Sequence, residues 1–533
     1  MGLGEAAVPA GSLRRRSIRF DGWTAVTLAA ALLVAGPLIS LPLSFIGGRG
    51  DAFTRFSGLL PEALWSTALL LVGVGLGTLV LGTALAALVT FCEFPGRSWI
   101  EWGLVLPLAM PGYVFTLFAL GVLDAWSPLR SAAGAICVFT LVLYPYVYLL
   151  ARSAFLAQSR TLVEAARGLG LSGRAALLRV AVPLARPAIF GGVALALMEA
   201  LADFGTVNLL GVHTFTDAIY RVWFLGFDRD AAMQLGTLLV SITLTLLALE
   251  RLARGRAAYH QAAASGQTLE RVRLRGPAAA AAVIGPLVLV GLVVAAPLAQ
   301  LSAWAVESIS EGLLPAEFGA AARNSLLLAL VGALLIAAFG TLLGYGLRAS
   351  HSRLTAAAVR VATIGYGLPG SVVAVAVIAP LGWLDERFGA LILTGSVIGL
   401  LAAYLVRFLA LAFQAVESSL ERVPRSLDEA ARGLGADRLD VLARVHLPLM
   451  RTGLLTACLL VFTEVMKELP ATLLLRPLNG DTLAVEVWQA THESLFETAA
   501  LPALLIVVAG LVPVVLLIRA SGRGRPDPAE ALP

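Results

Sequence analysis

Charged side chains occur inside two strongly apolar stretches of the chain. Glu199 and Asp203 are four residues apart in one stretch, and Glu464 and Glu468 have the same spacing in the other, with Lys467 beside them. On a helix this spacing puts both carboxylates on one face. An ionised group in the middle of a membrane costs about 2.5–3.5 kcal/mol on insertion scales, so such groups face a cavity or a partner.

Two interpretations of these five residues stay open. In the structural one, Lys467 pairs with Glu464 and the other groups lie near the water outside the membrane. In the functional one, the carboxylates line a central pathway, where their oxygens make transient contacts with a hard trivalent cation. Because tight coordination would trap that cation, we expect no tightly bound metal. The five histidines lack metal-site spacing, and the three cysteines indicate neither a disulfide framework nor a metal cluster.

The composition around these groups is typical of a membrane protein. Of the 533 residues, 59% are hydrophobic and 14% are charged, which excludes a soluble globular domain. Twelve apolar stretches are long enough to cross a bilayer as helices. They are approximately 23–46, 65–91, 100–122, 133–151, 187–210, 233–250, 278–304, 324–347, 357–381, 390–413, 452–475 and 499–518. We therefore predict an all-α integral membrane protein with about twelve transmembrane helices.

The distribution of basic residues predicts the orientation of these helices. Segments on the side of the N-terminus carry 30 arginines, with Arg407 counted among them, and the opposite loops carry eight. Basic residues concentrate on the cytoplasmic side of membrane proteins, so both termini are expected in the cytoplasm. The net charge of +5 then reflects membrane orientation, and the expected environment is the lipid bilayer with no nucleic acid bound.

The chain also contains a diverged tandem repeat. The residues Glu-Ala-Ala-Arg-Gly-Leu-Gly occur at 164–170 and again at 429–435, an offset of 265. Earlier in each half the offset is 258, so the second half carries about seven extra residues before its copy of this segment. An even number of spans in each half makes the halves parallel. The predicted organisation is a first half at 1–255, a cytoplasmic linker at 256–274 and a second half at 275–533.

Each repeated segment, at about 160–187 and 425–452, reads as two short helices joined at glycines. Capping boxes at Thr161 and Ser426 predict the start of the first helix. Left-handed glycines end it, and a second helix begins near Ser172 or Asp437. That helix runs to a proline that leads into the next span. Alanines keep the first helix slim, so another protein can approach it closely.

These segments resemble the EAA loop of ABC-importer permeases, whose pattern is Glu-Ala-Ala, three residues, Gly, nine residues and Ile-x-Leu-Pro. In that family the loop docks on the ATP-hydrolysing subunit. The residues that carry the resemblance, and therefore the implied docking, are Glu164, Ala165, Ala166, Gly170 and Pro183 in one half and Glu429, Ala430, Ala431, Gly435 and Pro448 in the other. The resemblance implies a type I importer fold of two parallel six-span halves, with the first span of each half wrapping the outside.

The same resemblance implies the partners. Lys467 is the only lysine and no P-loop surrounds it, so this chain is expected to be no enzyme and to bind no cofactor. Two copies of a cytoplasmic ATP-binding subunit would hold ATP and Mg²⁺, and an extracytoplasmic substrate-binding protein would deliver cargo. The location implied is the inner membrane of a bacterial cell, with the chain crossing it several times.

The cargo rests on resemblance alone. Residues 198–223 and 467–488 are similar to the ferric-iron permeases of this superfamily, which also fuse two six-span halves. Thiamine permeases share that architecture, so thiamine or another small solute stays an alternative. A secondary transporter driven by an ion gradient is the alternative from another class, and it has no reason to carry EAA segments.

Aromatic and basic residues in two outside loops are candidate contacts of the binding protein. They are Tyr220, Arg221, Trp223 and Trp488. Tryptophan and tyrosine at a membrane boundary are also common interfacial anchors, and the sequence does not decide between the two roles.

Overall fold

The fold is that of an all-α membrane protein, as predicted. The computed structural model describes residues 21–47, 58–123, 127–158, 168, 170, 172–254, 271–313, 317–350, 352–390 and 392–522. Within these ranges, nine helices are long and apolar enough to cross a membrane, or up to twelve when each of three bent helix pairs counts as one span. The strands in the same ranges are β1 (Cys92–Glu93) and β2 (Val272–Arg273), which pair in parallel.

The helices follow the order expected for a duplicated chain. Those up to residue 254 are α1 (Gly22–Ala35), η1 (Gly36–Ile39), α2 (Ser40–Gly47), α4 (Leu59–Phe91), α5 (Arg97–Gly103), η2 (Leu106–Ala109), α6 (Gly112–Leu123), η3 (Ser127–Leu129), α7 (Ala132–Ala157), α9 (Gly173–Ala176), η4 (Leu177–Ala181), α10 (Val182–Ala202), α11 (Gly205–Leu209), α12 (Phe215–Phe224) and α13 (Arg229–Arg254). The predicted linker falls largely on residues outside the described ranges, so the domain boundaries stay a prediction.

The later helices repeat this arrangement. They are α14 (Gly276–Val290), η6 (Gly291–Ala295), α15 (Ala296–Ser310), α16 (Phe318–Ser350), α17 (Arg353–Ala362), η7 (Thr363–Gly367), α18 (Gly370–Phe388), α19 (Val397–Glu421), α20 (Arg425–Gly433), α21 (Arg438–Asp440), η8 (Val441–His446), α22 (Leu447–Leu449), α23 (Arg451–Met466), α24 (Pro470–Leu475), α25 (Leu483–His492) and α26 (Phe496–Gly522).

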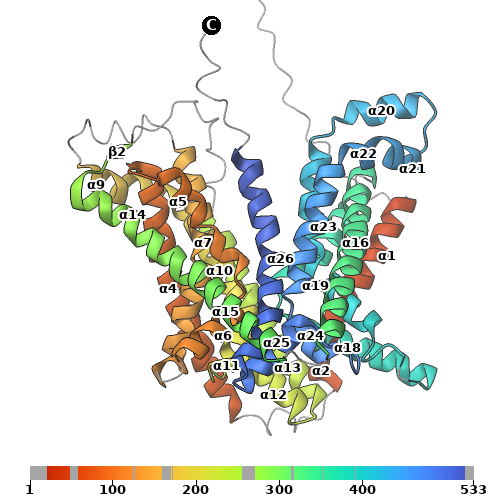
Figure 1. Ribbon diagram of the computed structural model, residues 1–533. Helices are drawn as coiled ribbons and strands as arrows, with labels where there is room; N and C mark the ends of the chain where they lie inside the picture. The colour runs from red at the N-terminus through yellow and green to blue at the C-terminus, as the bar shows by residue number, and fades with distance from the viewer. Residues whose placement is uncertain are drawn as a thin grey trace, which may run out of the picture.

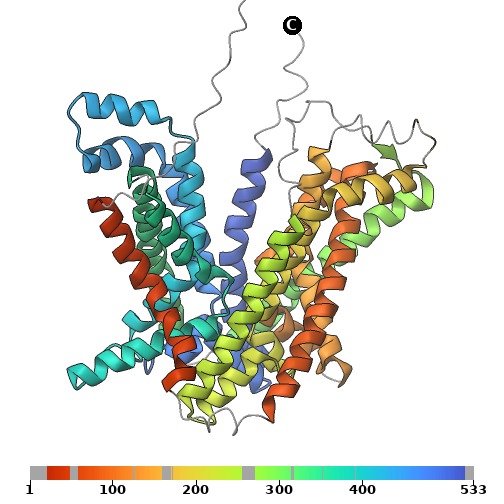
Figure 2. The same cartoon turned by 180° about the vertical axis from the view of Figure 1, so that it is seen from behind.

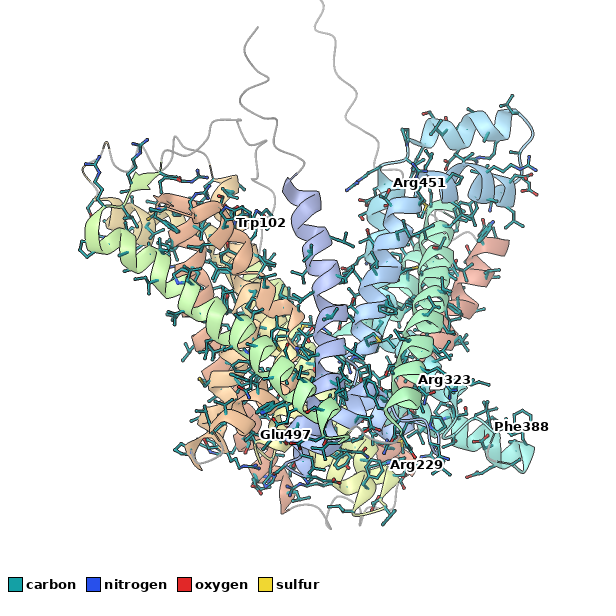
Figure 3. The ribbon with its side chains drawn as sticks, in the orientation of Figure 1. Trp102, Arg229, Arg323, Phe388, Arg451 and Glu497 are labelled. Atoms are coloured by element: carbon teal, nitrogen blue, oxygen red, sulfur yellow. The ribbon has the colours of Figure 1, made fainter. Side chains whose placement is uncertain are left out.

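The helices form two bundles that lie close together at one end and diverge toward the other (Figures 1 and 2). Helices α9 and α20 lie at the divergent end, and α11, α12, α24 and α25 lie at the closed end. Figure 3 places Arg451 at the divergent end and Arg229 and Arg323 toward the closed end. These arginines are therefore separated as the charge distribution predicts.

The first span packs against the opposite half of the chain. Helix α1 contacts α16 and α17, and α15 of the second half contacts α6 of the first. The α1 crossing is close, because a Cβ at Gly346 would collide with Thr27 Oγ1. Thr24 and Thr27 are fully buried there. Each first span is expected to wrap the outside. Helix α1 covers the other half and so also joins the two halves.

The seven extra residues of the second half lengthen α18. Helix α6 has 12 residues, whereas α18, its counterpart, has 19. The N-caps of the two following helices, Ser131 and Ser396, are already 265 positions apart. The additional turns carry α18 away from the bundle, with Phe388 at its far end (Figure 3).

Close packing of α4 on α7 predicts the effect of one substitution. A Cβ at Gly82 would lie 2.7 Å from Val147 Cβ and 2.9 Å from the Tyr144 carbonyl oxygen, so a side chain there forces the helices apart. We expect Gly82→Leu to destabilise the purified protein by about 1–3 kcal/mol, measured as a lower thermal unfolding midpoint in detergent. The control is Gly285→Leu, where an added Cβ has open space. Equal midpoints for the two variants would contradict this packing.

Candidate functional site

A cavity between the halves brings all five charged residues together. It measures about 90 Å³ and is lined by Glu199, Asp203, Glu464, Lys467 and Glu468. These residues come from equivalent places, where α10 gives way to α11 and where α23 gives way to α24. The described residues hold no group of three or more His, Cys, Asp or Glu arranged to bind a metal ion.

The two charged spans are broken, contrary to the prediction of continuous helices. Helix α10 ends at Ala202, and Asp203 has extended backbone. Its carboxylate accepts hydrogen bonds from the Thr206 amide (2.7 Å) and hydroxyl (3.1 Å), and so caps α11. Glu468 does the same for α24 by accepting from the Ala471 amide at 2.9 Å. Unpaired amides at a helix start need such acceptors. Asp203 and Glu468 therefore lie where one helix ends and the next begins. Neither shares a helix face with the glutamate four residues before it.

Two ion pairs cross the cavity wall. Lys467 Nζ lies 2.9 Å from Glu464 Oε1, as one interpretation of the sequence predicts. The second pair, Arg407 Nη1 to Glu468 Oε1 at 2.9 Å, is new. The prediction that Arg407 lies in a cytoplasmic segment is wrong, because it is within α19 and lines the cavity. One signal could have revealed it: Arg407 interrupts an apolar span, and its counterpart 265 positions earlier is Val142.

The repeated Pro-Gly pairs make room for these carboxylates. A Cβ at Gly112 would lie 2.6 Å from Thr206 Oγ1 and 3.0 Å from Asp203 Oδ2. A Cβ at Gly370 would collide with the Arg407 guanidinium and lie 2.5 Å from Glu468 Oε1. Glycine is therefore required at both places for the helices to approach the acids.

The cavity carries more acidic than basic groups. It is lined by four carboxylates and by Arg407 and Lys467, so two carboxylates are in excess when every group is ionised. In the described part of the chain, Glu199 and Asp203 form no salt bridge, whereas Glu464 and Glu468 do. The two carboxylates without a salt bridge are therefore those of the first half.

Three aromatic rings pack together beside the cavity. Phe204, which lines the cavity, packs against Tyr220 (ring centroids 4.7 Å apart) and Trp488 (5.9 Å). Tyr220 and Trp488 are 6.0 Å apart. We call these three residues the aromatic plug. Trp488 is only 9% exposed. This candidate contact of a binding protein is therefore largely buried within the group of rings.

The other candidate contacts lie around the plug. Tyr220 and Trp223 are half-buried and pack against the hydrophobic core. The Arg221 side chain is 37% exposed, and its Nε lies 2.8 Å from the buried carboxylate of Asp217. Arg221 is therefore the member of this set that combines exposure with charge. Binding-protein contact stays a prediction for all four.

The second repeated segment forms the predicted pair of helices. Helix α20 carries Glu429 and Ala430, which are exposed, and Ala431, which is half-buried, and Gly435 adopts the left-handed conformation (φ 87°) that ends it. Asp437 caps the next helix by accepting from the Asp440 amide at 2.7 Å. That helix ends beyond Pro448 at Leu449, and the chain bends by 75° into α23.

The capping box predicted at Ser426 is wrong. Pro424 is the N-cap of α20 and no side chain caps the helix. Because Pro424 sets the start two residues earlier, Ser426 falls inside the first turn. The acid that is used structurally is Asp428, which points toward the bundle, and Glu429 stays exposed.

Asp428 anchors α20 to the bundle. Its carboxylate accepts two hydrogen bonds from Arg348 of α16, at 2.8 and 3.0 Å, and one from the buried His446 at 2.8 Å. Burial alone would raise the pKa of Asp428, but the hydrogen bonds from Arg348 and His446 outweigh burial and lower the pKa below its ordinary value. The corresponding residues of the first half are Thr90, Val163 and Ala181, which cannot form this cluster.

The first repeated segment is described only in part. Glu164, Ala165 and Ala166, and the predicted capping box at Thr161, lie outside the described residues. Gly170 has the predicted left-handed conformation (φ 89°), and Ser172 Oγ accepts from the Ala175 amide at 3.3 Å. The predicted helix end at Pro183 is wrong, because the π-helical turn η4 runs directly into α10 and Pro183 sits in its first turn, where no amide is needed.

The Asp428 cluster predicts a pH-dependent loss of order in α20. Because the folded pKa is lowered, the stabilisation is fully present above the ordinary value of 3.8 and is lost as the pH falls through the lowered value. We expect Asp428→Asn at neutral pH to cost α20 about 1.5–3 kcal/mol of protection, measured by amide hydrogen exchange. The exposed Glu429→Gln is the matched control. Equal protection in both variants would contradict the anchoring role.

Comparisons with known proteins agree with this architecture. The profile of the family described as "binding-protein-dependent transport system inner membrane component" matches residues 78–249 and 336–524. The Fe(3+)-transport system permease protein FbpB 2 of Haemophilus influenzae is 27% identical over 509 residues, covering 92% of this chain and 97% of that protein.

Other relatives match one half of the chain. A probable molybdenum ABC transporter permease of Haloferax volcanii is 31% identical over 42% of this chain and 87% of its own length. The sulfate transport system permease CysW of Escherichia coli is 29% identical over 37% of this chain and 73% of its own length. Because the family profile matches two separate regions that cover most of the chain, the protein belongs to the family of inner-membrane permease components of binding-protein-dependent ABC transport systems.

Proposed function

We propose that this protein imports ferric iron, as the membrane-spanning subunit of an ATP-driven transporter with a separate ATP-binding subunit and a substrate-binding protein. The charge of the cavity carries this proposal. Two carboxylates in excess of the basic groups favour a cation, because an oxyanion such as molybdate or sulfate would meet net repulsion there. Carboxylate oxygens are also the ligand type that hard cations prefer.

The relatives support the same cargo. The Haemophilus influenzae protein that matches 92% of this chain is named as an Fe(3+) permease, whereas the molybdenum and sulfate permeases match less than half of it. An oxyanion remains the second candidate, since Arg407 and Lys467 also line the cavity. Their guanidinium and ammonium groups are already held by Glu468 and Glu464, which leaves them less available to an anion.

In this proposal the cation passes through weak contacts. Glu199 and Asp203 offer oxygens that form no salt bridge within the described residues, whereas the other two carboxylates are held in ion pairs. The broken helices let the acids reach the cavity without leaving amides unpaired. ATP and Mg²⁺ are held by two copies of the partner subunit, one on each repeated segment, and both termini of this chain face the cytoplasm.

Uptake of labelled cargo tests the proposal. A strain that lacks this gene is expected to lose ferric-iron uptake and to keep molybdate, sulfate and thiamine uptake. Glu199→Gln is expected to lower iron uptake about fivefold or more, because the cation then loses one carboxylate contact in the cavity. The exposed Glu386→Gln serves as the control. Loss of molybdate or sulfate uptake with iron uptake unchanged would replace iron by an oxyanion.

Docking of the ATP-binding subunit is tested separately by co-purification. Glu164→Ala combined with Glu429→Ala is expected to weaken the association about two- to fivefold, since both substitutions remove a negative charge from the predicted contact. A control is Glu311→Ala, an exposed acid outside the repeated segments. If the double variant retains the partner subunit as well as the control does, these glutamates take no part in docking.

A further inference from the structure

A hydrogen-bonded chain leads from the aromatic plug to the surface. Trp488 Nε1 donates to Asn208 Oδ1 at 3.2 Å, which joins α25 of the second half to α11 of the first. Asn208 Nδ2 in turn donates to Asp217 Oδ1 at 2.9 Å. Helices α11, α12 and α25 lie together at the end opposite α20 (Figure 1). The position of the Trp488 ring in the plug is thus linked to the state of Asp217.

Two exposed donors hold Asp217. Its side chain is 1% exposed, and its Oδ2 atom forms an ion pair with Arg221 Nε (2.8 Å) and a hydrogen bond with His213 Nδ1 (3.0 Å). Arg221 Nη2 also donates to His213 Nε2 at 3.3 Å. The side chains of Arg221 and His213 are 37% and 33% exposed, so an incoming protein can reach both. A buried carboxylate that loses such a partner is strongly destabilised, and it must find a new donor.

We propose that Arg221 and His213 form a docking surface for an acidic patch of the substrate-binding protein, and that this contact opens the aromatic plug through Asp217 and Asn208. A carboxylate from the partner competes with Asp217 for Arg221. Asp217 then binds the side-chain amide of Asn208 more closely. The hydrogen bond that Trp488 Nε1 donates to Asn208 Oδ1 is lost as a result. Glu62 Oε1, 3.9 Å from His213 Nε2, already places one carboxylate beside this surface.

The relay exists on one side only. At the offset of 265, the counterparts of Asn208, Asp217 and Arg221 are Leu473, Thr482 and Glu486. None of these can repeat the same chain of donors and acceptors. The second half therefore contributes the ring of Trp488, and the first half contributes the residues that hold this ring in place. Asn208 is therefore a positioning residue that acts through Trp488.

The proposal rests on the permease working with a binding protein and is independent of cargo, because its test measures ATP hydrolysis without iron. The complete complex with its ATP-binding subunit is placed in lipid nanodiscs, with and without binding protein. Trp488→Phe keeps an aromatic ring at this position, although a smaller one, and removes the indole N–H group. Loss of one hydrogen bond that closes the plug is expected to raise hydrolysis in the absence of binding protein about two- to tenfold.

Trp304→Phe is the matched control. Trp304 is 8% exposed, stacks on Phe496, and its indole donates no hydrogen bond within the described residues. Asn208→Leu, which copies the residue of the second half, is expected to act as Trp488→Phe does, and the double variant to add nothing further. Unchanged hydrolysis in Trp488→Phe and Asn208→Leu, or an equal rise in Trp304→Phe, would overturn the relay.

The docking surface is tested by titration with the binding protein. Arg221→Gln is expected to raise the concentration needed for half-maximal stimulation about fivefold or more, and Arg221→Lys to restore part of the loss because it keeps the charge. Added salt should weaken stimulation in the wild type more than in Arg221→Gln. A titration curve that Arg221→Gln leaves unchanged would overturn the docking surface, whatever the result for cargo.

Discussion

The structure depends on supplying hydrogen-bond donors to carboxylates that are buried in an apolar surrounding. Glu468 is 4% exposed and is tolerated because the Arg407 guanidinium and the Ala471 amide both donate to it. That arrangement requires a helix break at Lys467, a glycine at position 370 and an arginine in the middle of α19. The cavity between the halves follows from these requirements, because the broken helices turn their ends toward it.

The two halves share one architecture because the chain is duplicated, but they have diverged at the cavity and in the loops. Both halves keep the broken helix, the Pro-Gly pair and a left-handed glycine in the repeated segment. Only the second half has Arg407 and Lys467 at the cavity and the Arg348, Asp428 and His446 cluster. Only the first half has the chain from Arg221 to Asn208. The salt bridges at the cavity thus belong to the second half, and the proposed relay belongs to the first.

The two ends of the molecule are connected through long helices. Arg348, which holds Asp428 of α20, is near the end of α16, a helix of 33 residues. Ser325, near the start of the same helix, accepts the Leu483 amide at the start of α25, and α25 carries Trp488. Helix α16 is therefore hydrogen-bonded to α20 near one end and to α25 near the other.

Hydropathy and repetition determined the all-α class, the duplication and the left-handed glycines, because each depends on nearby residues or on composition. The Lys467–Glu464 pair is one of two interpretations that the sequence leaves open, and the structure shows it. The helix breaks at Asp203 and Glu468, the place of Arg407 and the start of α20 were decided by tertiary structure. A carboxylate becomes a cap, and an arginine its partner, only when segments such as α19 and α24, about sixty residues apart, meet at one cavity. Spacing along one helix cannot reveal such a partner, since the energy of a buried charge is set by whichever groups the fold brings within hydrogen-bonding distance.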